Sequence, residues 1–288
     1  MDLTAVVAIQ VLYAVASLAI VSAGLAVIFG MMRVINLAHG EFMMLGAYSV
    51  IGATRLGINL WLAIFLVAPV VVGLVGVVLE RVVIRHLYGR MVDTMLATWG
   101  LSLLLVGIVT SVFGNTTAGV SAPLGSFMIG QYSVSGYTLV VIAVAVALAL
   151  AIYWVLTRTQ LGLIARGTMQ KPAMADALGI SPTRVYCATF AIGAALSGLA
   201  GGLLAPLTGV VPTMGGAFVA KAFITVIGGG PAILAGLVSA SGLFGAINQL
   251  GTFLTTPVFG EVALLLAAIV MLRLLPQGIT GRFFKGAL

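Results

Sequence analysis

Long apolar runs, separated by short polar or charged connections, fill almost the whole chain. Crossing the hydrocarbon core of a bilayer takes about 20 apolar residues in helical form. Runs of about this length lie at residues 7–29, 60–83, 94–113, 137–157, 185–207, 232–250 and 260–275. The pattern predicts an all-α fold, namely a polytopic transmembrane helical bundle of about eight apolar segments that include broken or re-entrant helices.

The first interruption follows Arg33, where polar residues enter an otherwise apolar stretch. Asn36, His39 and Glu41 lie there beside Gly40 before the apolar pattern resumes. Ionisable groups at membrane depth are costly and normally face a bundle interior or a water-filled path, and such paths are lined by interrupted helices. These residues therefore predict a broken or re-entrant segment on a translocation path. The alternative is that they cap helix ends near the interface, with His39 and Glu41 paired.

A second interruption lies at residues 218–227, an apolar run too short to cross a membrane alone. Lys221 is near its start, and Gly228, Gly229, Gly230 and Pro231 end it. A helix break within the membrane is the natural interpretation, because glycine and proline both interrupt helices. The glycine triplet lacks the Lys-Ser/Thr pair of a phosphate-binding loop.

Residues 158–184, here called the basic segment, carry the densest charge of the chain. Arg158, Arg166, Lys171 and Arg184 face a single acid, Asp176. The excess of positive charge predicts that this segment lies in the cytoplasm.

The middle of the basic segment has the features of a short helix. Pro172 suits a first helical turn, and Gly179 suits a left-handed stop after it. Ala173, Met174, Ala177 and Leu178 would then form an apolar patch below the membrane. Such a patch among basic neighbours suits a soluble docking partner, but an ordinary connecting loop that only sets topology is an equal alternative.

Composition agrees with a membrane protein and excludes several other classes. The 288 residues are 62% hydrophobic and 7% charged, with a mean hydropathy of +1.26. The net charge of +7 is therefore a topological signal and does not indicate nucleic-acid binding. The single cysteine, Cys187, excludes an internal disulfide. No motif of a nucleotidase, hydrolase or zinc protease occurs, so we expect a transport subunit without enzymatic activity, metal or cofactor.

The other connections complete the predicted topology. A short basic stretch from Glu80 to Asp93 is predicted to be cytoplasmic, whereas residues 114–136 carry no charge and suit the outer face. Residues 185–207 hold small residues at four-residue spacing, which predicts a tightly packed interior helix. Arg282 and Lys285 place the tail in the cytoplasm, and the start of the chain, without a basic stretch or cleavage site, predicts a retained first span.

Three stretches resemble one family of membrane proteins. GLAVIFGMMRVINLAHGEFMMLGAY at residues 24–48, TQLGLIARGTMQKPAMADALGISPTRV at residues 159–185 and RLLPQG at residues 273–278 resemble the permeases of high-affinity branched-chain amino acid ABC importers. The resemblance implies a single permease domain over residues 1–288 in the bacterial inner membrane. It also implies four kinds of partner besides membrane lipid: a second homologous permease, two cytoplasmic ATP-binding subunits and an extracytoplasmic substrate-binding protein.

The resemblance further implies that the basic segment is the coupling loop, seated in a groove of the ATPase. The coupling residues would be Gly162, Arg166, Met174, Ala175, Asp176 and Gly179. The loop motif of the wider importer class usually has Glu ahead of an Ala pair, whereas this chain offers Asp176 at a shifted place.

Two further readings of the function stay open at this stage. The same family includes importers of urea, short amides and other small carboxylates. An ion-coupled secondary transporter or channel is the rival outside the family, with Glu41 or Glu261 as the proton-linked acid.

Overall fold

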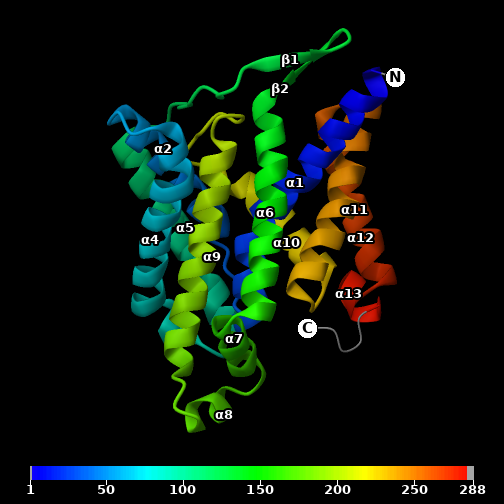
Figure 1. Ribbon diagram of the computed structural model, residues 1–288. Coiled ribbons are helices and arrows are strands. Elements are labelled where there is room, and N and C mark those ends of the chain that lie inside the picture. The colour runs from blue at the N-terminus through cyan, green and yellow to red at the C-terminus, as the bar shows by residue number, and fades with distance from the viewer. Residues whose placement is uncertain (1, 284–288) are drawn as a thin grey trace. The chain divides into compact units, whose positions relative to one another are not determined.

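The computed structural model describes residues 2–283 and is helical along most of its length (Figure 1). Within these residues, seven helices are long and apolar enough to cross a membrane, and a shorter apolar helix accompanies them. The predicted all-helical membrane bundle is confirmed. The helices are α1 (Asp2–Met32), α2 (His39–Arg55), α3 (Leu60–Leu62), α4 (Ala68–Val82), α5 (Met91–Phe113), α6 (Gly136–Arg158), α7 (Gln160–Gln170), α8 (Pro172–Ala177), α9 (Pro182–Leu204), α10 (Gly215–Gly229), α11 (Ile233–Leu254), α12 (Pro257–Leu274) and α13 (Gly278–Phe283).

The chain divides into two compact units, whose boundaries fall inside α1, α6 and α10. The first unit comprises the described parts of Met1–Ser22, Ser121–Leu150 and Lys221–Leu288, and the second comprises Ala23–Val120 and Ala151–Ala220. In the first unit, α11 and α12 pack side by side (Figure 1). Their contact is filled by large apolar side chains, among them Phe244, Leu264 and Met271.

The second unit is built around α9, which packs against α2 and α4. Its core includes Phe42 of α2 and Phe190 of α9, whose rings meet edge to face with centroids 5.9 Å apart. The small residues predicted to make α9 an interior helix do so, because Gly198 and Gly201 are buried against neighbouring backbones.

Two local irregularities were not foreseen from the sequence. A π-helical turn at Ala63–Val67 joins α3 to α4 just before Pro69. Proline lacks an N–H and its ring crowds the preceding turn, which a wider turn relieves.

The uncharged connection before α6 contains a β-hairpin, the second irregularity. Strands β1 (Ser126–Ile129) and β2 (Tyr132–Ser135) pair antiparallel around a two-residue loop. Gly130 opens this loop with a φ of +61°, a conformation that favours glycine and is typical of tight hairpins. Its Cα lies beside the Asp2 side chain at the start of α1.

Candidate functional site

The predicted break after Arg33 is present, and side chains satisfy the backbone groups that it exposes. Arg33 adopts a left-handed φ of +54°, and helical structure resumes only at His39. The Asn36 Oδ1 atom accepts a hydrogen bond from the Ala38 N–H at 3.1 Å. Thr98 of α5 accepts one from the Leu37 N–H at 3.1 Å. An interrupted helix in a membrane protein requires such partners because lipid supplies none.

His39 is fully buried and connects α2 to α9. Its Nδ1 atom lies 3.1 Å from the Ser197 hydroxyl, which itself donates to the Gly193 carbonyl at 2.8 Å. Because the serine hydrogen is used on Gly193, the His39 ring nitrogen acts as the donor to the serine oxygen. The partner of His39 here is thus Ser197, and not Glu41 as the interface-capping alternative supposed.

Glu41 is also buried, with 5% of its surface exposed. The Ser102 side chain of α5 hydrogen-bonds to its carboxylate, and Gly215 at the start of α10 lies against its Oε1 atom. Asn36, His39 and Glu41 therefore lie together at the break, each bonded within the second unit. In this conformation they brace the break instead of facing an open space.

Close glycine contacts hold the elements around the break together. A Cβ atom added to Gly40 would overlap the Gly215 backbone, and one added to Gly201 would overlap the Met43 carbonyl. Gly46 and Gly198 meet in the same way between α2 and α9. Small residues allow membrane helices to approach this closely, and dispersion contacts then stabilise the packing.

Lys221, predicted to lie near the second break, forms an ion pair in the first unit. Its Nζ atom lies 2.6 Å from the Glu261 Oε1 atom, which joins α10 to α12. Both side chains are partly exposed. Pairing lowers the cost of placing either charge in a membrane-spanning segment.

The predicted glycine break ends α10, and it packs against the short helix α13. Gly228 lies against the side chains of Phe244 and Met271, and Gly229 against the Gly236 backbone. Gly230 has a φ of +86°.

Thr280 of α13 completes this turn. Its hydroxyl donates to the Gly229 carbonyl at 2.6 Å and accepts from the Ala232 N–H at 3.3 Å. The RLLPQG stretch thus leads into the element that closes the glycine turn, within the first unit. The predicted position of Lys285 lies outside the described residues.

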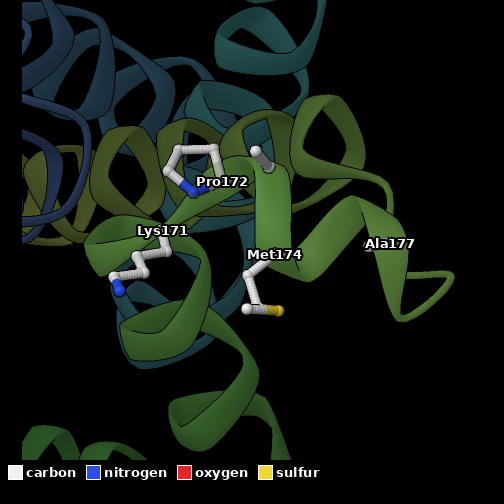
Figure 2. Close-up of a pocket in the computed structure, with 5 residues that line it drawn as sticks. Lys171, Pro172, Met174 and Ala177 are labelled. Carbon is white, nitrogen blue, oxygen red and sulfur yellow. The ribbon is translucent and has the colours of Figure 1, made fainter.

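The basic segment folds into two helices, of which the second confirms the predicted short helix. Figure 2 shows the turn between α7 and α8, where α8 begins at Pro172. Gly179 follows α8 with a φ of +82°, as predicted. Met174 and Leu178 are 58% and 72% exposed, so the apolar patch exists. Ala175 is buried, whereas Asp176 is exposed.

Two coupling candidates lie in α7 and fix its direction. Gly162 is buried where α7 turns back on α6, and a Cβ atom there would overlap the Val155 carbonyl. Its N–H donates to the Thr159 hydroxyl at 3.2 Å, and its carbonyl accepts from the Arg166 Nε atom at 3.3 Å. These contacts position α8 relative to the end of α6.

An open hollow of about 450 Å³ adjoins α8. It is lined by Lys171, Pro172, Ala173, Met174 and Ala177, and its walls are mostly apolar (Figure 2). Four of these five residues belong to α8 itself. The hollow and the exposed patch form one surface, which we call the α8 surface.

Sequence reasoning missed the partners of the break. Thr98 and Ser197 are single hydroxyl residues inside apolar helices, and nothing in a linear pattern separates them from hydroxyl residues that bond only to their own helix. It also missed the buried Glu80, whose hydrogen bonds to Tyr88 and Arg85 hold the connection between α4 and α5. Burial and the neighbouring carboxylate raise the pKa of Tyr88 far above its usual value, so its hydroxyl remains a donor.

Comparisons with known proteins agree with this arrangement. Residues 7–275 match the family described as the permease component of branched-chain amino acid transport systems. The permease protein BraD of Pseudomonas aeruginosa is 28% identical over 281 residues, which cover 92% of this chain and 91% of BraD. LivH of Escherichia coli K12 is 28% identical over 280 residues, with the same two coverages of 92% and 91%.

One solved structure, PsaBC from Streptococcus pneumoniae in complex with Fab, covers 96% of this chain and 93% of its own at 15% identity. Its TM-score of 0.49 is too low to carry an argument. The family match extends over nearly all of the described helices and includes both interruptions and the basic segment. The chain is therefore a multi-pass membrane permease and belongs to the permease-component family of branched-chain amino acid ABC transport systems.

Proposed function

We propose that the chain is the membrane-spanning subunit of an ATP-driven importer for branched-chain amino acids or related small polar solutes. The observation that carries the proposal is the α8 surface. A water-exposed apolar helix on a basic segment is costly unless a partner covers it. The proposed partner is a cytoplasmic ATP-binding subunit, two of which serve a pair of permeases, with a binding protein on the other side. The names of BraD and LivH support the choice of branched-chain amino acids.

The proposal assigns a side of the membrane to each end of α6. This helix starts at the β-hairpin and ends at the basic segment (Figure 1). Its 23 residues are long enough to cross the hydrocarbon core. With the basic segment in the cytoplasm, the hairpin lies outside, and so does Asp2, which contacts Gly130.

The two interruptions have separate roles in the proposal. Asn36, His39 and Glu41 brace the break beside the translocation path, so that the α2 start can shift relative to α9 during transport. Lys221 and the glycine turn at residues 228–230 shape the second interruption. Gly162 and Arg166 hold α7, and Met174, Ala175, Asp176 and Gly179 form or support the surface that meets the ATPase.

A pair of matched methionine variants tests the partner assignment. Met174 lies on α8 and Met128 on the hairpin, with 58% and 65% of their surfaces exposed. We expect Met174→Asp to abolish co-purification of the ATP-binding subunit from native membranes, because a charge would be buried in the contact. Met128→Asp should leave co-purification unchanged. Equal recovery of the ATP-binding subunit with both variants would contradict the proposal.

Uptake in proteoliposomes tests the substrate and the energy source. The reconstituted importer with its binding protein should accumulate labelled leucine, isoleucine or valine only when ATP is supplied. Accumulation of labelled urea or acetamide instead would move the assignment to the urea and short-amide importers. Uptake by the chain alone under an ion gradient, lost on Glu41→Gln, would favour the ion-coupled transporter.

A further inference from the structure

A buried carboxylate near the end of α4 holds the connection that leads to α5. The Glu80 side chain is fully buried in the second unit. The Tyr88 hydroxyl donates to its Oε1 atom at 2.5 Å, and the Arg85 Nη2 atom lies 3.4 Å from its Oε2 atom. Both partners come from the short connection after α4, which contains a 3₁₀ turn at Ile84–Leu87.

The same group of residues reaches the start of α9. The rings of Tyr88 and Tyr186 meet edge to face with centroids 5.0 Å apart. The Cys187 side chain is also close enough to Glu80 to interact with it. Tyr186 and Cys187 lie in the first two turns of α9, which begins at Pro182. We call Glu80, Arg85, Tyr88 and Tyr186 the clamp.

Only a short stretch separates the clamp from α8. Helix α8 ends at Ala177 and α9 begins at Pro182. The stretch between them folds back on α8, since the Gly179 N–H bonds to the Asp176 carbonyl and the Ile180 N–H to the Ala175 carbonyl, both at 2.9 Å. A displacement of α8 is therefore passed on directly to the first turns of α9.

The clamp is strong enough to survive such a displacement. A buried carboxylate without partners is highly unfavourable, so Glu80 resists separation from Tyr88 and Arg85. Hydrogen bonds to a charged group are stronger than those between neutral groups. The aromatic contact adds a directional attachment to α9.

We propose that Glu80 is a positioning residue that fastens the α4–α5 connection to the start of α9, so that this connection and α8 move together during the transport cycle. The inference rests on the proposed role of α8 in meeting the ATP-binding subunit. It gives the importer a second cytoplasmic element that follows ATP-driven movement, and through it a route from α8 to α4 and α5.

The test measures how much substrate is transported for each ATP hydrolysed by the assembled importer in proteoliposomes. Tyr88→Phe removes the hydrogen bond but keeps the ring against Tyr186, and Glu80→Gln keeps the shape of the acid without its charge. We expect Tyr88→Phe to lower the transport-to-ATP ratio roughly tenfold, since loss of a hydrogen bond to a charged group shifts an equilibrium by at least that much. Tyr153→Phe, at an exposed position of α6, is the matched control and should leave the ratio unchanged.

A double-variant cycle separates positioning from a purely structural role. If the two residues act through one bond, Glu80→Gln combined with Tyr88→Phe should lower the ratio less than the product of the two single effects. A fall in yield or unfolding temperature with an unchanged ratio overturns the inference and leaves a structural role. The same holds if the ratio is unchanged in Tyr88→Phe while the unaltered chain co-purifies with its ATP-binding subunit. Failure of that co-purification would instead remove the proposed function, and the inference with it.

Discussion

The contact between α2 and α9 provides a sharp test of how this fold is held together. Gly46 lies where the two helices approach most closely, against the backbone of Gly198. Gly52 lies six residues further along the same helix, with no heavy atom within 4 Å of its added Cβ position. Gly46→Ala and Gly52→Ala therefore add the same methyl group to one helix in a crowded and an open place.

The size of the effect follows from the geometry. The new Cβ atom at Gly46 would overlap the Gly198 carbonyl oxygen and lie 2.6 Å from the Gly198 Cα, whereas ordinary contact begins at 3.4 Å. The helices would have to separate by about 0.8 Å, and neither backbone can rotate away as a side chain could. Overpacking of this kind costs about 1–3 kcal/mol. The better helix propensity of alanine offsets up to about 1 kcal/mol in Gly46→Ala and is the only effect in Gly52→Ala.

Thermal unfolding in detergent measures the difference. Cys187 is the single cysteine of the chain and is buried, so a thiol-reactive fluorescent dye reports its exposure as the protein unfolds. We expect Gly46→Ala to unfold roughly 4 °C or more below Gly52→Ala, since each kcal/mol shifts the Tm by about 2–4 °C in a chain of this size. Equal unfolding temperatures for the two variants would refute the reasoning that backbone contact at Gly46 sets the helix spacing.

Two further predictions concern membrane sidedness and the glycine turn. In a Cys187→Ala background, a membrane-impermeant maleimide added outside spheroplasts should label Met128→Cys but not Met174→Cys, and inside-out vesicles should reverse the pattern; labelling of both from one side would contradict the proposed topology. Gly230→Ala should destabilise the chain by about 1–3 kcal/mol, because the position has a left-handed φ and touches the Gln277 carbonyl, whereas Gly242→Ala in α11 meets open space; an unfolding temperature for Gly230→Ala no lower than that of Gly242→Ala would count against this role.

The local chemistry of the basic segment made α8 predictable. Pro172 and Gly179 mark the two ends of a helix by constraints that belong to single residues, namely a fixed φ and a permitted left-handed one. The same is true of the long apolar helices, whose length is set by the thickness of the membrane. Such features depend on neighbours in the chain and need no knowledge of the fold.

The partners of the polar residues depended on contacts between distant positions. The sequence suggested His39 and Glu41 as partners because they are adjacent, yet His39 bonds to Ser197, 158 positions away. Two residues apart on one helix point in different directions, so sequence proximity was a poor guide here. The ion pair of Lys221 with Glu261 was equally hidden, since each residue alone resembles an ordinary helix-end charge.

The amino-acid sequence by itself determined the class of this protein, because hydrophobic length, positive-inside charge and glycine or proline interruptions are properties of local segments read by the bilayer. Only the tertiary structure decided which backbone groups the break at residues 33–38 uses and which glycines allow helices to touch. It also decided that Glu80 joins the α4–α5 connection to the start of α9. These contacts arise from packing between segments far apart in the chain, and packing is specified by the fit of three-dimensional surfaces that no linear pattern contains.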